Sequence, residues 1–258
     1  MLCFLYCVFF FLGTCIGSFL NVIALRHNTE HTYHSRSACP HCGTTLQWFE
    51  LVPIFSYIAQ LGRCRTCRGL ISIRYLLVEI FLGLLFSALL FRFFSPIYLF
   101  QVDIVIAFVF AVVTFSILAL LVLYDVSHLE LPGNILLTFV VASISSVYLF
   151  HIDIFNTEIL RHFLLGMTIA IPFLVLAFFS REKWIGYGDG ILLLGIGALL
   201  GLIKGLFAIA LASWLALVVY FPFILFKKQK NKLKIPFVAF LAVATIVMFV
   251  FPLDQFFF

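Results

Sequence analysis

Two aspartates beside long apolar runs are the residues of this chain best suited to do chemistry. Asp125 follows Leu121-Val-Leu-Tyr, and Asp189 lies within Gly186-Tyr-Gly-Asp-Gly. A carboxylate inside a membrane-spanning helix costs about 3 kcal/mol on insertion scales, so its presence indicates a function. Two carboxylates that meet can share one proton, because neighbouring like charges do not easily both ionise. The pair predicts acid/base chemistry. The alternative is that both are ordinary helix-end charges, and position alone does not decide between the two.

Four cysteines form a second group with an informative spacing. Cys39 and Cys42 are separated by two residues, as are Cys64 and Cys67, with 21 residues between the pairs. Two intervening residues let a tight turn direct both sulfurs at one ion, so this pattern predicts a zinc site. Disulfides are the alternative, and a reducing cytoplasm disfavours them. His41 could replace one ligand, although a spectator role is the simpler expectation.

The expected role of this metal site is structural. Four thiolates leave no coordination position for substrate or water. A polar loop of this size has little apolar core, and zinc contributes about 10 to 16 kcal/mol to the folding of zinc-finger peptides. Three further cysteines, Cys3, Cys7 and Cys15, lie in the first apolar run without this spacing and are expected to be packing residues.

The elements that must position these groups are membrane helices. Hydrophobic residues make up 64% of the 258 residues and charged residues only 10%, and 34 residues are Phe. So much apolar surface cannot be buried inside one soluble domain of this length. Runs near the roughly 20 residues that cross a bilayer predict about eight spans: 2–25, 76–94, 104–124, 134–150, 160–180, 190–204, 206–226 and 236–253. Only Lys204-Gly205 separates the sixth run from the seventh, so six or seven spans are alternatives.

We expect an all-α polytopic membrane protein with three parts. Residues 1–25 form a retained first span, because they lack the basic start of a secretory signal and the run is too long for one. Residues 26–75, the only sizeable polar region, form a small zinc-binding cytoplasmic loop domain, and residues 76–258 form the transmembrane core. Gly13 and Gly17 are small enough to let the first span approach a neighbouring helix closely.

The distribution of Lys and Arg sets the orientation. Thirteen fall in loops on one side of the membrane, and only Arg92, Arg161 and Lys204 fall on the other. The positive-inside rule places Asp125 and Asp189 together at the cytoplasmic boundary, since the first ends an inward-running helix and the second begins an outward-running one. Both termini are expected outside, and these loops in the cytoplasm: 26–75, 125–133, 181–189 and 227–235.

The net charge of +5 is explained by this topology. The cations are spread over several loops, and no basic face alternates with exposed aromatic residues. We therefore expect no nucleic-acid partner. The basic run 227–234 is expected to touch anionic lipid headgroups.

The residues around each aspartate suggest how its surroundings are built. Three of the five residues from Gly186 to Gly190 are glycine, which argues against a regular helix start there. An opened backbone at membrane depth is tolerated where it lines a water-filled cavity, and hydrolysis needs water at the reacting carbonyl. Pro132 cannot continue a helix, and Ser127, His128 and Glu130 are expected to form a short polar turn after Asp125.

Together these motifs resemble the type IV prepilin peptidase family, membrane enzymes that cleave prepilin leader peptides and N-methylate the new amino terminus. The resemblance begins with Gly17-Ser-Phe-Leu-Asn-Val22 and Cys39-Pro-x-Cys, and it ends with Gly186-x-Gly-Asp189 and Pro236-Phe-x-x-Phe-Leu-Ala. A lone Gly-x-Gly-Asp motif is weak evidence, but its occurrence together with the other motifs in this order is specific to the family. The segment ending at Pro132 also matches, and so do these residues: Leu46, Trp48, Glu50, Leu51, Pro53, Ser56, Tyr57, Gly62-Arg-Cys-Arg-x-Cys67, Ile71-Ser72, Arg74-Tyr75 and Glu79.

The resemblance implies that Asp125 and Asp189 are the catalytic aspartates of a Gly-x-Gly-Asp protease. In that mechanism an ionised carboxylate takes a proton from water while the other, protonated, polarises the scissile carbonyl, and no covalent intermediate forms. The implied substrates are prepilins or type II secretion pseudopilins, cut at the cytoplasmic face of the bacterial inner membrane. The implied cosubstrate for methylation is S-adenosylmethionine.

Methyl transfer rests on the resemblance alone, because the sequence contains no Gly-rich nucleotide loop. Glu50 and other residues of the 26–75 loop are candidates for it, and Glu50 could equally be a structural partner of nearby arginines. One departure from the family is Ile191, where a Lys often stands two residues after the second aspartate. The missing cation leaves substrate positioning to other groups.

Three alternatives of other kinds remain at this point. A membrane scaffold with a zinc-stapled loop would keep the cysteines and helices but tolerate loss of either aspartate. A proton-coupled transporter would place carboxylates near mid-bilayer and contain internal repeats, of which we find no convincing one. A peptidase without methyltransferase activity is the narrowest alternative.

Overall fold

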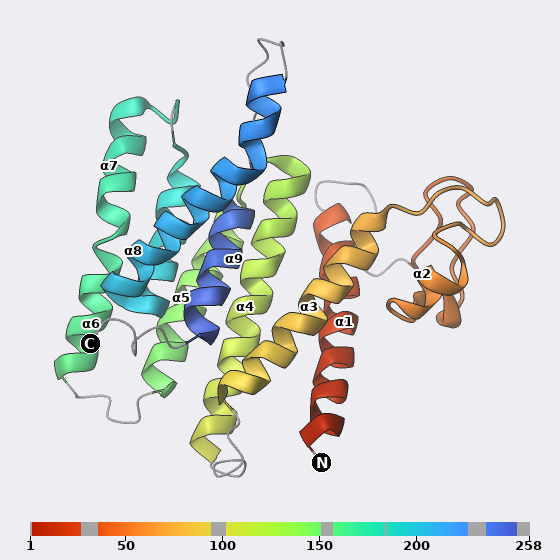
Figure 1. The fold of residues 1–258 in the computed structure, drawn as a ribbon, viewed down its shortest axis with the longest axis horizontal. Helices are drawn as coiled ribbons and strands as arrows, with labels where there is room; N and C mark the ends of the chain where they lie inside the picture. The colour runs from red at the N-terminus through yellow and green to blue at the C-terminus, as the bar shows by residue number, and fades with distance from the viewer. Residues whose placement is uncertain are drawn as a thin grey trace. The chain divides into compact units, whose positions relative to one another are not determined.

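The computed structural model describes residues 2–26, 36–93, 102–150, 157–183, 185–226 and 236–251 (Figure 1). These residues form helices joined by short loops, which confirms the predicted all-α class. The elements are α1 (Leu2–Arg26), the 3-10 helix η1 (Trp48–Leu51), α2 (Phe55–Ala59), α3 (Ile73–Phe93), α4 (Val102–His128), α5 (Gly133–Phe150), α6 (Thr157–Met167), α7 (Ala170–Ser180), α8 (Tyr187–Phe226) and α9 (Phe237–Val250). The basic run at 227–234, expected to touch lipid headgroups, lies outside the described residues.

The chain divides into two compact units, Met1–Leu90 and Phe91–Phe258. The first contains α1, the polar loop with η1 and α2, and nearly all of α3. The second contains α4 to α9. The two helices that flank the polar loop in sequence therefore share a unit with it, and the two aspartates lie together in the other unit.

Glycines bring α1 and α3 into close contact within the first unit. A Cβ atom on Gly13 would overlap the carbonyl oxygen of Leu82, and one on Gly17 would lie 3.2 Å from Cα of Glu79. Gly83 of α3 is approached just as closely from α1. Small residues let membrane helices gain dispersion contacts at short range. The packing role predicted for Gly13 and Gly17 is confirmed.

Aromatic rings join α4 to α9 in the second unit. Phe115 of α4 and Phe249 of α9 have ring centroids 4.9 Å apart at an interplanar angle of 62°. Phe93 contacts both Phe249 and Phe108, with centroids 6.1 Å and 5.9 Å away. The Phe115–Phe249 and Phe93–Phe108 pairs are edge-to-face, an arrangement that stabilises beyond the area it buries. This packing holds α4 beside α9.

The helix α8 is bent at Gly201, whose φ of 78° and ψ of 179° lie outside the helical region. Figure 1 shows that the two parts of α8 run in different directions. The predicted break at Lys204-Gly205 is therefore misplaced. The reason is tertiary: a Cβ atom on Gly166 of α6 would overlap Gly197 and crowd Cα of Gly201, so α6 packs against the bend. Glycine takes the positive φ without a steric penalty.

Five of the described helices are long and apolar enough to cross a membrane: Cys3–Arg26, Ile73–Phe93, Val102–His128, Phe163–Ser180 and Tyr187–Phe221. Two shorter apolar helices are Gly133–Ser146 and Phe237–Val250. Each of the eight predicted apolar runs coincides with one of these segments when the two parts of α8 are taken separately. The count of eight spans is thus approximate, because two of the segments are short and two others belong to one bent helix.

Candidate functional site

Asp125 is buried near the carboxyl end of α4, with 8% of its surface exposed. The backbone N–H of Val238, at the start of α9, donates a hydrogen bond to its carboxylate. Its Oδ2 atom is buried with no geometric hydrogen-bond partner among the described residues. A buried polar atom left unpaired destabilises a fold, so its retention points to a chemical role.

Asp189 lies half-buried in the first turn of α8. It stands three residues after Gly186, and its carboxylate accepts a hydrogen bond from the backbone N–H of Gly186. An acidic side chain in this position satisfies a free backbone donor at the helix start and is stabilised by the helix dipole. The charge of Asp189 acts on the Asp125 carboxyl group, so the fold brings the two predicted residues into electrostatic contact.

The glycines around Asp189 do not open the helix start as predicted. The helix α8 begins at Tyr187, so Gly188 and Gly190 are helical. A Cβ atom on Gly188 would lie 3.1 Å from the side chain of Leu131, and one on Gly190 would crowd Leu174 of α7. The glycines are needed because neighbouring side chains pack directly on this turn. The expectation of an irregular start is wrong.

The polar turn predicted at Ser127, His128 and Glu130 begins later than expected, because Ser127 and His128 still belong to α4 and only Glu130 lies beyond it. The backbone carbonyl of Asp125 accepts a hydrogen bond from the backbone N–H of Leu129, 2.9 Å away, and this bond closes the last turn of α4. Leu129 then adopts a positive φ of 55°, and Pro132 precedes the first residue of α5. The chain therefore leaves α4 within four residues of the aspartate, and Leu131 is placed against Gly188.

The four cysteines of the polar loop meet at one point. Their Sγ atoms all lie within 4.8 Å of one another, and the Sγ atoms of Cys39 and Cys67 are 3.8 Å apart. All seven cysteines of the chain are free thiols. The cluster can hold one metal ion. His41 lies outside it, with its Nε2 atom 3.3 Å from the carbonyl oxygen of Leu70, as a spectator would.

Two similar turns present the thiols. After each Cys-x-x-Cys the next residue, Gly43 or Arg68, has a positive φ and donates its N–H to the carbonyl of Cys39 or Cys64, 2.9 Å away in both. Isolated β-bridges, Ala38 with Thr45 and Arg63 with Leu70, close the two turns. This repeated geometry is the physical reason that two residues between cysteines direct both sulfurs to one side.

The surroundings of two of these thiols favour the thiolate, which is the metal-binding form. Those of Cys67 do not: despite a hydrogen bond from the backbone N–H of Gly69, burial and the neighbouring sulfurs raise its pKa to about 11. The hydroxyl of Thr44, followed by its backbone N–H, lowers the pKa of Cys42 to about 6. Backbone N–H groups of Cys67 and Thr66 lower the pKa of Cys64. Metal binding competes with protons for thiol sulfur, so a lowered pKa favours binding near neutral pH.

A cavity of about 540 Å³ lies in the first unit, between the metal loop, α1 and α3. Its volume is within the range of small-molecule sites. The groups lining it include two acids, two arginines and two tyrosines: Glu50, Glu79, Arg26, Arg74, Tyr57 and Tyr75. The cavity therefore offers charges of both signs and aromatic faces to one ligand.

Glu50, one of the cavity residues, also has a structural task. Its Oε2 atom accepts a hydrogen bond from the backbone N–H of Gln47, 2.8 Å away, at the start of η1. The sequence suggested nearby arginines as structural partners of Glu50, but the hydrogen bond is with the backbone of Gln47. The side chain can both cap η1 and line the cavity.

Glu79 is a site residue whose role sequence reasoning missed. It is buried in α3, and its Oε2 atom accepts a hydrogen bond from the backbone N–H of Ile54, 2.7 Å away. The hydroxyl of Ser18 in α1 also donates to it. The signal was available, because an acid within an apolar run is the feature that singled out Asp125.

Comparison with known proteins gives consistent matches. The model of the bacterial peptidase A24 N-terminal domain matches residues 11–93, and that of the type IV leader peptidase family matches residues 112–221. A prepilin leader peptidase/N-methyltransferase of Myxococcus xanthus is 36% identical over 76% of this chain and 56% of that protein. One of Vibrio cholerae is 29% identical over 80% of this chain and 81% of that protein. No solved structure matches significantly.

Proposed function

Because the chain belongs to the type IV leader peptidase family, we propose that it is a membrane aspartic endopeptidase that removes the leader peptide of type IV prepilins or type II secretion pseudopilins. The chain spans 56% of its Myxococcus relative, and about four fifths of its Vibrio relative. The observation that carries the proposal is that Asp189 of α8 lies close enough to Asp125 of α4 for its charge to act on the Asp125 carboxyl group.

The proposed reaction needs two carboxyl groups in different protonation states. The ionised one takes a proton from a water molecule as the oxygen attacks the scissile carbonyl, and the protonated one donates to the carbonyl oxygen. The tetrahedral intermediate then collapses and the C–N bond breaks. The leaving amine takes the proton that the first carboxyl received from water, and a hydroxyl of the intermediate returns a proton to the second carboxyl as the new carboxyl group forms. Neighbouring carboxyls suit this cycle because both do not easily ionise together. The unpaired Oδ2 of Asp125 has a free acceptor position for water or substrate.

The proposed location is the cytoplasmic face of the bacterial inner membrane. Asp125 stands near the carboxyl end of α4, and Asp189 stands at the amino end of α8, so each lies at the end of its helix. The excess of Lys and Arg in the neighbouring loops assigns this side to the cytoplasm. A prepilin leader that remains in the cytoplasm ahead of an apolar helix would present its cleavage site there.

We propose zinc as the metal of the four-cysteine cluster. Sulfurs at about 2.3 Å from a tetrahedral zinc ion lie about 3.8 Å apart, which matches the Cys39 to Cys67 separation. Four thiolates fill the coordination sphere, so the ion stabilises the loop and takes no part in cleavage. Cys39 and Cys64 are buried, and Cys42 and Cys67 are exposed.

The methyl-transfer site is proposed in the cavity between the metal loop, α1 and α3. S-adenosylmethionine, when bound, supplies an electrophilic methyl group to the new amino terminus. Glu50 and Glu79 would complement its sulfonium and ribose, Arg74 its carboxylate, and Tyr57 and Tyr75 its adenine. The volume of about 540 Å³ is adequate for a ligand of this size.

Coexpression with a candidate prepilin tests the whole proposal, with the mass of the pilin amino terminus as the readout. Loss of the leader mass together with the addition of one methyl group supports both activities. Loss of the leader without the methyl group identifies a peptidase that lacks methyltransferase activity. Intact leader with every prepilin tested contradicts the peptidase and favours a scaffold.

A further inference from the structure

The segment from Trp48 to Leu61, which contains η1 and α2, presents large apolar side chains outward. Five of them are between 41% and 84% exposed: Trp48, Phe49, Phe55, Ile58 and Leu61. Leu51, 44% exposed, lines the cavity of about 540 Å³ instead. Soluble surfaces rarely carry a contiguous apolar patch of this kind without a partner. The patch therefore needs an apolar environment.

The polar side chains of the same segment face inward. Glu50, Ser56, Tyr57 and Gln60 all line the cavity of about 540 Å³. The hydroxyl of Tyr57 donates to the carbonyl of Ile71 across it, at 3.4 Å. Polar residues inside and apolar residues outside reverse the arrangement of a water-exposed loop. They suit a segment that contacts lipid on one side and, on the other, a cavity lined by polar and charged side chains.

The segment lies beside α1 and α3 at positions well inside the length of each helix. Residues 53–55 line a second cavity, of about 650 Å³, together with Thr14 of α1 and Ser87 of α3. Thr14 is twelve residues from Arg26, where α1 ends, and Ser87 is fourteen residues from the start of α3. At 1.5 Å per residue these are distances of about 18 Å and about 21 Å along the helices. A hydrocarbon layer about 30 Å thick includes such depths.

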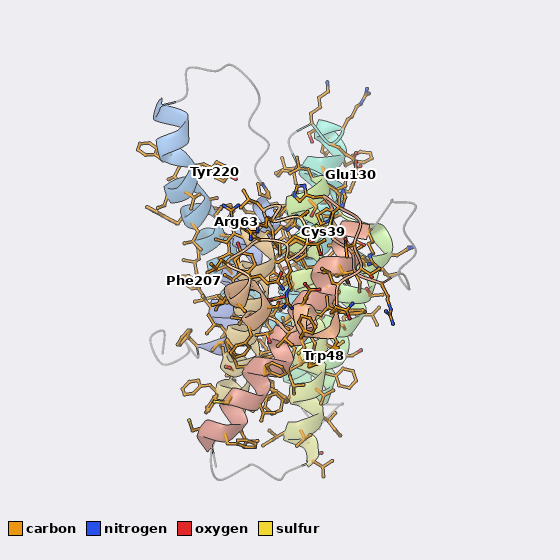
Figure 2. The ribbon with its side chains drawn as sticks, turned by 90° about the vertical axis from the view of Figure 1, so that its right-hand side faces the viewer. Cys39, Trp48, Arg63, Glu130, Phe207 and Tyr220 are labelled. Carbon is orange, nitrogen blue, oxygen red and sulfur yellow. The ribbon has the colours of Figure 1, made fainter. Side chains whose placement is uncertain are left out.

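Figures 1 and 2 agree on the position of the segment along α1. Figure 1 shows α2 level with the middle of α1 and not beyond its end. Figure 2, turned about the same vertical axis, labels Trp48 near the middle of α1 and Cys39 near its carboxyl end. The metal cluster thus lies at the loop end of the first unit, and the apolar segment extends from it along α1.

The backbone of the segment is adapted to a medium without water. Ile54 has a positive φ of 63°, which is rare for a β-branched residue. Its N–H is satisfied by the carboxylate of Glu79, which is six residues, or about 9 Å, into α3. Non-helical backbone at membrane depth is tolerated only where protein groups or a wet cavity satisfy it.

We propose that residues 48–61 form a re-entrant segment that enters the hydrocarbon layer beside α1 and α3 and contacts lipid acyl chains. The exposed side chains of the segment are large and apolar, as are the exposed side chains of those two spans, which include Phe19 of α1 and Leu77 of α3. The predicted cytoplasmic loop at 26–75 is then divided, with the metal turns in water and the segment between them in lipid. The proposal does not rest on the catalytic assignment.

Trp48 is a built-in reporter for the test. The full chain, with Trp184→Phe and Trp214→Phe, is reconstituted in vesicles of phosphatidylcholine brominated near the middle of its acyl chains. Bromine quenches tryptophan emission by contact, and iodide added to the water quenches exposed tryptophan. A single-tryptophan variant retaining Trp214, 68% exposed on the spanning helix α8, serves as the lipid-contact control. Arg63→Trp, in the metal turns with the other tryptophans replaced, serves as the water-contact control.

The expected result is quenching of Trp48 by bromolipid to at least half the extent seen for Trp214, with iodide quenching several-fold weaker than for Arg63→Trp. Quenching by iodide alone would place the segment in water and overturn the proposal. Quenching by neither agent would show that protein covers the segment and would overturn it equally. Ile58→Trp in a chain without other tryptophans repeats the measurement on α2, so the outcome does not depend on one side chain.

Discussion

The carboxylate of Glu79 accepts a hydrogen bond from the backbone N–H of Ile54 at 2.7 Å, across 25 residues of sequence. Ser18 of α1 donates to the same carboxylate, so one side chain connects α1, α3 and the polar loop. Because Ile54 is held at a positive φ, the hydrogen bond sustains a backbone conformation that the residue would not adopt alone. Glu79 is thus a positioning residue for the loop and for the cavity it lines.

Glu79→Ala is expected to destabilise the polar loop by about 1 to 2 kcal/mol, because it leaves the Ile54 N–H unpaired in a half-buried position. Glu79→Gln keeps an acceptor oxygen and should lose much less. Rates of limited proteolysis between Ile54 and Ile71 in the purified protein measure the effect. Equal cleavage rates for the two variants would show that the hydrogen bond does not hold the loop.

Asp125→Asn and Asp189→Asn are each expected to lower prepilin cleavage by at least about 100-fold, the usual scale for loss of an acid/base group. The matched control is Asp103→Asn, which makes the same change at the opposite, exposed end of α4. Amounts of protein in the membrane fraction show that each variant inserts. Near-normal cleavage by either active-site variant would remove that aspartate from the mechanism.

The aspartate pair and the cysteine cluster could be predicted because their signals are local. A charge in an apolar run and a two-residue spacing between thiols are visible without the fold. The bend at Gly201 could not be predicted in this way. The hydropathy pattern is interrupted at Lys204, whereas contact with Gly166 of α6 decides where the helix bends. The Glu79 to Ile54 contact was missed for the same reason, since it pairs residues that only tertiary structure brings together.

The local sequence is a poor guide to two short stretches, for reasons of length and context. The apolar residues between Trp48 and Leu61 are interrupted by polar ones, so they form no run long enough to span a membrane and count as loop. The glycines beside Asp189 suggested a loose backbone, yet Leu131 and Leu174 occupy the space that their missing side chains leave. In both cases the structure of the stretch depends on which residues pack against it, and those residues are distant in sequence.

Cys42→Ser is expected to abolish binding of one zinc ion per chain, because three thiolates and a hydroxyl no longer match the site. Cys7→Ser, in α1 and outside the cluster, should bind zinc as the parent does. Metal content of the purified proteins by elemental analysis distinguishes them. Zinc retained at one ion per chain by the Cys42 variant would show that another group completes the site.

Zinc retention is also expected to depend on pH. The pKa of Cys42 is lowered to about 6, so its thiol is largely ionised at neutral pH and takes up a proton as the pH falls below that value. Protons and metal compete for the same sulfur. Dialysis against a weak chelator should therefore remove little zinc at pH near 7 and progressively more below about 6. Loss independent of pH over this interval would contradict the competition.

Gly166→Ala tests whether the bend of α8 is held by its contact with α6. The added methyl group would overlap the carbonyl of Gly197 and crowd Gly201, and overpacking of this kind costs about 1 to 3 kcal/mol. Gly133→Ala is the matched control, because nothing lies within 4 Å of the added atom at the start of α5. That change should be neutral or slightly stabilising, since alanine restricts the unfolded chain. Thermal unfolding in detergent compares the two variants. A Gly166 variant as stable as the Gly133 variant would mean that α6 and α8 can separate at little cost, and the bend would then need another cause.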